Sequence, residues 1–142
     1  MKNFIEVFDN ALSSEDCKYI IDYMNTNGLM KTGSVKTPEG TRVVYEYKTS
    51  SEMGMDIQDK NPINDIIGIS LSYQIEKYKE SHPQLDKIAK WGVQEKYNLQ
   101  KYNPGQGYHS PHCENMDGPS PRILAWMVYL NTVNDKGGTY FT

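Results

Sequence analysis

His112 and Glu114 are separated by a single residue, and their side chains are of types that bind metal ions. In an extended chain, alternate side chains project from the same face, so the imidazole and the carboxylate would point the same way while Cys113 points away. Together they supply two parts of the 2-His-1-carboxylate set, which binds Fe(II) and leaves coordination positions open. The spacing therefore predicts that His112 and Glu114 hold a divalent metal ion.

The other histidines allow different interpretations of the same stretch. His109 and His112 would share a face on a helix, but Pro111 between them argues against a helix. We interpret His109 as a residue of a pocket mouth or of the surface, and we expect His82 on the surface. A zinc site would need four convergent ligands, and nothing in the spacing of the histidines and Cys113 predicts that they converge.

The residues around this pair form a series of short strands and turns. Residues 102–105 (Tyr-Asn-Pro-Gly) predict a strand end and a turn, because Pro and Gly supply the dihedral angles that a turn needs. The apolar run 123–130 is long enough for a buried strand, and Gly137-Gly138 permits a tight turn with positive φ before residues 139–141. Strands in this order form an antiparallel meander that suits a sandwich or a jelly roll.

Four short motifs occur in order in this part of the chain. They are Y-x-P-G-x-G-Y at 102–108, H-x-E at 112–114, R-x-L-x-W-x-x-Y-L-N at 122–131 and G-G-T-x-F at 137–141. Together they resemble the 2-oxoglutarate/Fe(II) dioxygenases of the prolyl 4-hydroxylase type. The resemblance is strong over residues 95–142 and loose before them. Asp is the commonest carboxylate in that family, and Glu114 is similar to a subgroup.

The resemblance implies a fold, an activity and roles for individual residues. It implies an α+β fold with a double-stranded β-helix (jelly-roll) core buttressed by two N-terminal helices. The implied activity is Fe(II)- and 2-oxoglutarate-dependent hydroxylation of peptidyl proline, with ascorbate as a further cofactor. His112 and Glu114 would bind iron, and Tyr102 and Tyr129 would lie beside 2-oxoglutarate. Arg122 would lie on the substrate side of the pocket, although a solvated strand end explains it equally well.

Two groups that the family uses would lie beyond the end of this sequence. The second histidine, and the Arg or Lys that pairs with 2-oxoglutarate, follow the carboxylate at a greater separation than residues 114–142 provide. We therefore expect residues 1–142 to be a single domain that forms the N-terminal portion of such a fold, without its closing strands. Two hypotheses remain open: an oxygenase completed by residues from elsewhere, and a non-catalytic remnant that acts as a binding or interaction domain.

Composition narrows the class of protein and its partners. Among 142 residues, 15 Lys and Arg nearly balance 18 Asp and Glu, so charge gives no reason to expect binding to nucleic acid or to an anionic membrane. Two distant cysteines indicate a reducing compartment, and no apolar run reaches membrane-spanning length. We expect a cytoplasmic protein that takes a peptide or small-molecule substrate. An open sheet edge would favour self-association.

Two helices are expected before the motif region. Ser13 or Ser14 can cap the first helix, whose apolar face combines four residues at helical spacing: Cys17, Ile20, Ile21 and Met24. Asn61-Pro62 begins the second helix, whose apolar stripe is Ile63, Ile67, Leu71 and Tyr78.

The remaining segments are expected to be strands and one loop. Residues 4–8, 41–48 and 95–102 predict strands, with Val43, Tyr45 and Tyr47 on one face of the second, while residues 29–41 predict a surface loop. The polar face of the third strand fits a ligand cavity or solvent equally well.

Overall fold

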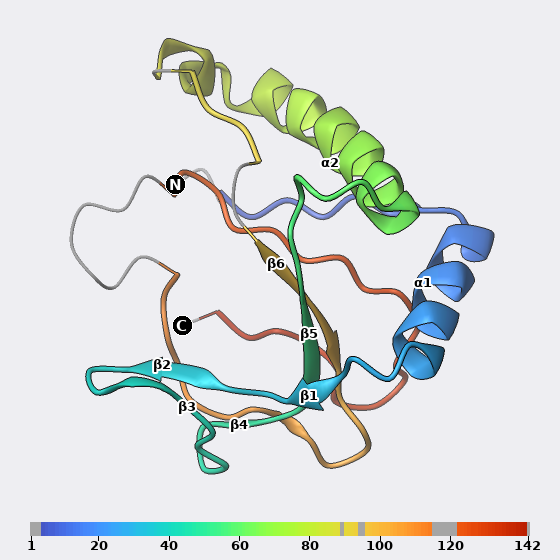
Figure 1. Ribbon diagram of the computed structural model, residues 1–142. Helices are drawn as coiled ribbons and strands as arrows, with labels where there is room; N and C mark the ends of the chain where they lie inside the picture. Colours follow the sequence, from blue (N-terminus) through green and yellow to red (C-terminus); the bar gives the residue numbers. More distant parts are fainter. Residues whose placement is uncertain (1–3, 89, 94–95, 115–121, 142) are drawn as a thin grey trace.

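The computed structural model describes residues 4–88, 90–93, 96–114 and 122–141 of the chain. These residues form a mixed α+β fold with two helices and small antiparallel sheets (Figure 1). The sheets of this part of the chain do not close into a barrel, so the predicted jelly-roll core is not confirmed. No helix among the described residues has the length and apolar character needed to cross a lipid bilayer.

Helix α1 (Ser14–Thr26) begins where the sequence predicted it. The Ser13 side chain is the N-cap and accepts a hydrogen bond from the Asp16 backbone N–H at 3.0 Å, which satisfies one of the free donors of the first turn. Ile20 and Met24 are buried, whereas Cys17 and Ile21 are only partly buried. The predicted apolar face is therefore correct, and its centre is formed by Ile20 and Met24.

Helix α2 (Pro62–Ser81) is the longest element and also matches the prediction. Asn61 is the N-cap, and its side chain accepts a hydrogen bond from the Ile63 backbone N–H at 2.8 Å. The predicted apolar stripe is buried along its whole length, at Ile63, Ile67, Leu71 and Tyr78. Ile63 and Ile67 pack the first half of the helix against the core of the central sheet, whereas Tyr78 near its end stacks on His82 (Figure 1).

The central sheet has the order β1-β5-β6 and consists of Lys31–Thr32, Ser51–Met55 and Tyr97–Lys101. Strand β6 lies within the predicted strand 95–102, and its register places Met53 opposite Leu99. The side chains of Met53, Met55 and Leu99 join the buried residues of both helices in one hydrophobic core. Asn98 and Gln100 on the other face are exposed, so in the described part of the chain this polar face meets solvent.

Strands β2 (Val35–Thr37), β3 (Gly40–Arg42) and β4 (Lys48–Thr49) replace elements that the sequence predicted differently. Strands β2 and β3 form a hairpin inside residues 29–41, so the prediction of a simple surface loop was wrong. The predicted strand 41–48 was also wrong, because residues 43–47 form a turn between β3 and β4. The three large side chains expected on one strand face, Val43, Tyr45 and Tyr47, are exposed.

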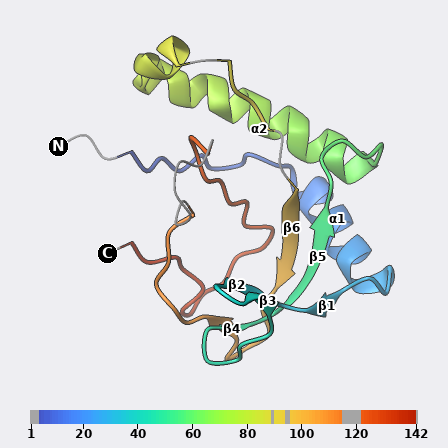
Figure 2. The same cartoon turned by 60° about the vertical axis from the view of Figure 1, so that its left-hand side comes forward.

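The ends of the described chain are extended and belong to no sheet ladder. Residues 4–8 lie along α2, where Tyr78 donates its hydroxyl hydrogen to the Phe4 carbonyl at 2.7 Å, and they are not the predicted strand. Residues 122–141 run across the molecule and turn back, as the red segment in Figures 1 and 2 shows. Their positive φ falls at Lys136 (φ 58°) and not at the glycine pair that follows it, contrary to prediction.

Residues 123–130 alternate between the core and the surface without forming a ladder. Trp126 and Leu130 pack against the hydrophobic core, and the Trp126 ring contacts the Tyr97 ring with centroids 5.5 Å apart. Met127 and Tyr129 are instead exposed by 60% and 59%. Trp126 and Tyr129 therefore lie on opposite faces, as in a strand, while the pairing expected of a buried strand is not seen in the described residues.

Candidate functional site

His112 and Glu114 meet at the end of an irregular segment that follows strand β7 (Gly107–Tyr108). The distance from His112 Nε2 to Glu114 Oε1 is 3.6 Å. Both side chains are partly open to solvent, with 38% of the imidazole and 57% of the Glu114 side chain exposed. The structure thus brings together the two residues that the sequence singled out, although they lie outside any ladder.

A hydrogen bond fixes which nitrogen of His112 faces Glu114. Nδ1 of His112 lies 3.1 Å from the Ser110 carbonyl oxygen, which only accepts hydrogen bonds, so Nδ1 carries the hydrogen. In the neutral ring, Nε2 then has its lone pair available on the side of Glu114. A backbone carbonyl bound to one ring nitrogen is the usual way in which proteins orient a metal-binding histidine.

The Tyr108 ring stacks on the His112 ring. Their centroids are 4.0 Å apart and their planes differ by 19°. Tyr108 is held in turn by strand pairing, because β7 is antiparallel to β4 and Tyr108 lies opposite Lys48. The Lys48 ammonium lies 5.6 Å from the centre of the Tyr108 ring, within the range of a cation–π contact.

Lys48 is buried, and its charge is compensated by Glu52. The Lys48 Nζ to Glu52 Oε2 distance is 2.6 Å, and Glu52 Oε1 accepts hydrogen bonds from the Ser34 backbone N–H at 2.9 Å and from the Ser34 hydroxyl at 3.1 Å. Burial would raise the pKa of the Glu52 carboxyl, but these hydrogen bonds and the Lys48 charge outweigh it and hold that pKa below its ordinary value.

Tyr102 and Tyr129, the two tyrosines expected beside 2-oxoglutarate, are close enough to interact electrostatically. Burial, reinforced by Glu52 and by the nearby Tyr108 and Tyr129, raises the pKa of the Tyr102 hydroxyl. The Tyr102 hydroxyl donates to Gln100 Oε1 at 2.8 Å, and the Tyr129 hydroxyl lies 2.6 Å from Thr139 Oγ1. Both hydroxyls are therefore engaged by side chains of the protein.

Tyr108 joins this group electrostatically as well as by stacking. Burial, followed by the negative charges of Glu114 and Glu52, raises the pKa of the Tyr108 hydroxyl. Tyr108 therefore lies close enough to both Glu114 and Glu52 to interact electrostatically with each carboxylate.

Arg122 contacts Glu114, although the sequence assigned it to a substrate or to a solvated strand end. Its Nη1 donates to the Glu114 carbonyl oxygen at 2.8 Å and lies 3.5 Å from Glu114 Oε2. The guanidinium therefore bridges the segments on either side of residues 115–121 and holds one oxygen of the candidate ligand.

The other histidines are separate from this site. His109 Nε2 lies 3.2 Å from Thr49 Oγ1, and its backbone N–H donates to the Tyr47 carbonyl at 2.7 Å. Cys17 and Cys113 are free thiols. Across the described ranges, no three His, Cys, Asp or Glu side chains form a group that could hold a metal ion, so the structure offers two such ligands here and not four.

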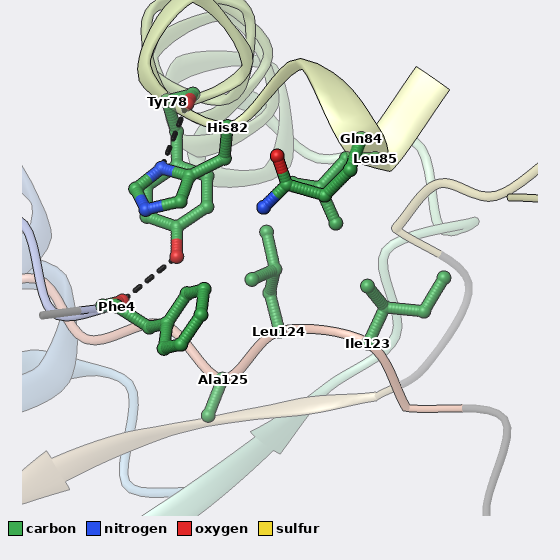
Figure 3. Close-up of a pocket in the computed structure, with 8 residues that line it drawn as sticks. All are labelled: Phe4, Tyr78, His82, Gln84, Leu85, Ile123, Leu124 and Ala125. Carbon is green, nitrogen blue, oxygen red and sulfur yellow. Dashed lines mark hydrogen bonds between the residues drawn. The ribbon is translucent and has the colours of Figure 1, made fainter. Parts of the chain in front are cut away.

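The prediction that His82 lies on the surface was wrong. It is 3% exposed at the C-cap of α2, where its ring stacks on Tyr78 with centroids 4.2 Å apart. Figure 3 shows it in the wall of a cavity of about 320 Å³ between the end of α2, Phe4 and residues 123–125. This cavity does not include the candidate ligands, so His82 belongs to the packing of the N-terminal segment against α2.

Sequence reasoning missed the side chains that support the pair. Tyr108 lies inside a motif that was noticed, but no role was given to it. Lys48 was placed at the end of the predicted strand 41–48, and nothing was predicted for Glu52 or for a buried ion pair. Lys48 and Glu52 are four residues apart and lie on two different strands, so neither helical nor strand periodicity predicts their contact. Only the pairing of β4 with β7 brings Lys48 beside the site.

Comparison of the chain with models of protein families, with curated proteins and with solved structures found no match.

Proposed function

We propose that this chain carries the metal-binding half of an Fe(II)- and 2-oxoglutarate-dependent hydroxylase of the prolyl 4-hydroxylase type. The observation that supports it best is the approach of His112 Nε2 to Glu114 Oε1, at 3.6 Å, with Nδ1 turned to a backbone carbonyl. The motif resemblance over residues 95–142 supplies the identity of the metal and of the cosubstrate.

The geometry of the pair suits a divalent ion. Metal–nitrogen and metal–oxygen bonds of about 2.1 Å can join two ligand atoms that are up to about 4.2 Å apart, and the observed separation lies within that limit. The alternative to a metal is an ordinary His–Glu ion pair, which would require the imidazole to be protonated. A titration with metal separates these two explanations.

The chain's own residues would do three things around the metal. His112 and Glu114 would bind it, and the Tyr102 and Tyr129 hydroxyls would exchange their present partners for the carboxylate of 2-oxoglutarate. When bound, Fe(II) and 2-oxoglutarate would supply the activation of oxygen. Arg122 would face the substrate, for which peptidyl proline is the first candidate by resemblance.

We further propose that the described sheets are the first part of a jelly roll. Strand β6 is paired on one edge only, by β5, and the alternating residues 123–130 contact the same core without a ladder partner in the described chain. Further strands, from a longer chain or another polypeptide, would complete the sheet. The same strands would supply a third ligand and a cation for 2-oxoglutarate.

One observation favours the alternative of a non-catalytic remnant. Arg122 Nη1 lies 3.5 Å from Glu114 Oε2, so the guanidinium already neutralises the negative charge with which Glu114 would bind a metal ion. A binding or interaction domain could keep this contact as a structural tie between two segments. The substitution Arg122→Ala should then lower stability without raising metal affinity.

The test combines metal binding with turnover. Binding of Co(II), a spectroscopic substitute for Fe(II), should be weak in the 142-residue chain and lost in His112→Ala and Glu114→Gln. His109→Ala, the same change three residues away, is the matched control and should bind as the wild type does. Equal binding by all four proteins would refute the assignment of the ligands.

Turnover distinguishes the two functions. Succinate formation from 2-oxoglutarate with Fe(II) and ascorbate should be slight in the 142-residue chain. A chain extended through its coding sequence to the natural stop codon should form succinate in a Glu114-dependent manner. Failure of the extended chain to do so would favour the remnant.

A further inference from the structure

The Tyr108 side chain packs directly against the candidate ligand His112. The two rings are stacked, with centroids 4.0 Å apart and planes 19° from parallel. Stacked aromatic rings attract each other beyond the effect of the area that they bury. The His112 side chain is 38% exposed, so few other side chains pack against it. Its orientation therefore depends largely on the Tyr108 ring and on the hydrogen bond to Ser110.

The hydrogen bond to Ser110 does not orient His112 by itself. It tethers Nδ1 to a carbonyl only two residues away, within an irregular segment that belongs to no ladder. Rotation about that single tether would carry Nε2 away from Glu114. A second contact with the flat face of the ring restricts that rotation, and the Tyr108 ring supplies such a contact.

Tyr108 is itself well fixed. Its backbone belongs to the β4–β7 ladder, where it lies opposite Lys48. The Lys48 ammonium lies 5.6 Å from the Tyr108 ring centre, and that ammonium is anchored by Glu52 at 2.6 Å. Glu52 is held in turn by two hydrogen bonds from Ser34. A buried ion pair thus fixes an aromatic ring, and the ring fixes an imidazole.

We propose that Tyr108 is a positioning residue, which holds the His112 imidazole in the orientation that turns Nε2 toward Glu114. This inference rests on the proposed function for its metal, but the orientation of the ring can be measured without any metal. The contact requires an aromatic ring and not the hydroxyl, so Tyr108→Phe should preserve it. Tyr108→Leu should lose it while keeping an apolar side chain of similar volume.

The first measurement is proton NMR of the imidazole. The chain has only three histidines, so the His112 ring signals can be assigned by comparison with His112→Gln. Stacking under Tyr108 should shift those signals upfield in the wild type and in Tyr108→Phe. In Tyr108→Leu they should move downfield, and the close contacts between the His112 ring and the Glu114 side chain should weaken.

The second measurement is affinity for Co(II). Tyr108→Leu should bind about three- to tenfold more weakly than the wild type, as expected from the loss of one stacking contact. Tyr108→Phe should bind normally. Tyr45→Leu removes an exposed tyrosine from the segment between β3 and β4 and is the matched control. If Tyr108→Leu does not fold, Tyr108→Val, which suits a strand, replaces it.

The outcomes separate this inference from the proposed function. Unchanged His112 signals in the non-aromatic variant, or shifted signals with unchanged Co(II) affinity, would overturn the positioning role while leaving the metal site intact. Absence of Co(II) binding in the wild type would refute the proposed function. In that case the NMR measurement alone tests the positioning role of Tyr108. Contacts between His112 and Glu114 that survive in Tyr108→Leu would overturn the inference.

Discussion

The ammonium of Lys48 lies 2.6 Å from the carboxylate of Glu52, and both side chains are shielded from solvent, with 4% and 13% of their surfaces exposed. A buried ion pair offsets the cost of removing two charges from water only while both members are present. The effects of removing Lys48 and of removing Glu52 on the free energy of unfolding should therefore not be additive, and a double-mutant cycle can measure this.

Removal of one member of this pair should be costly. Glu52→Gln keeps an acceptor for Ser34 but leaves the Lys48 charge buried and unpaired, so the free energy of unfolding should fall by about 3–5 kcal/mol. The double variant with Lys48→Met and Glu52→Gln should lose less than the sum of the single changes, by about 1–3 kcal/mol. Urea unfolding of the four proteins measures this coupling, and strict additivity would show that the pair is not formed.

The same carboxylate predicts how stability depends on pH. The pKa of Glu52 is lowered from its ordinary value of 4.5, so the folded state binds this proton less readily than the unfolded state. Its contribution to stability is present in full above about pH 4.5 and is lost as the pH falls through the lower pKa of the folded state. Unfolding curves from pH 7 to pH 3 should therefore show a steeper loss in the wild type than in the Lys48→Met, Glu52→Gln double variant. Parallel curves would contradict the lowered pKa.

Gly33 packs against Ser50 too closely to accept a side chain. A Cβ at Gly33 would lie 2.0 Å from Ser50 Oγ and 3.3 Å from the Ser50 backbone oxygen. Gly33→Ala should lower the free energy of unfolding by about 1–3 kcal/mol, and adding Ser50→Ala should restore part of that loss. Gly68 in α2 has open space around it, so the control Gly68→Ala should raise stability by up to about 1 kcal/mol. Equal effects at both glycines would show that contact with Ser50 is unimportant.

In the described part of the chain, β6 pairs on one side only and residues 123–130 join no ladder, so we expect the chain to self-associate. An exposed edge is a template for another strand, and this segment also exposes Met127. Sedimentation velocity should show species larger than a monomer as concentration rises. Met127→Lys should reduce association, because a charge on an edge opposes pairing. Val7→Lys, a change at another exposed apolar residue, should not. A monomer at all concentrations would exclude this surface as an interface.

The sequence by itself determined both helices and the strand that leads to the site. Ser13 and Asn61 cap their helices through side chains that act within three residues, and the stripe from Ile63 to Tyr78 follows directly from helical periodicity. The opposite faces of Trp126 and Tyr129 follow from strand alternation in the same way. These features are local, so the chain needs no distant partner to specify them.

The tertiary structure decided everything that depends on a distant partner. Within residues 29–48, β1 and β4 form by pairing with β5 and β7 later in the chain, whereas β2 and β3 pair with each other. His82 was expected on the surface because it precedes a proline, yet the N-terminal segment covers it. Residues 123–130 have strand periodicity but no ladder in the described chain, because alternation specifies faces and does not supply a partner.

The candidate site shows the same division. The spacing of His112 and Glu114 predicted that their side chains would lie together, and they approach to 3.6 Å although the segment is not a strand. Only the fold could show that Tyr108 covers the imidazole and that Arg122 holds Glu114. Stacking and ion pairing act over a few ångströms between residues whose approach is fixed by the pairing of β4 with β7 and by the return of the chain at Arg122.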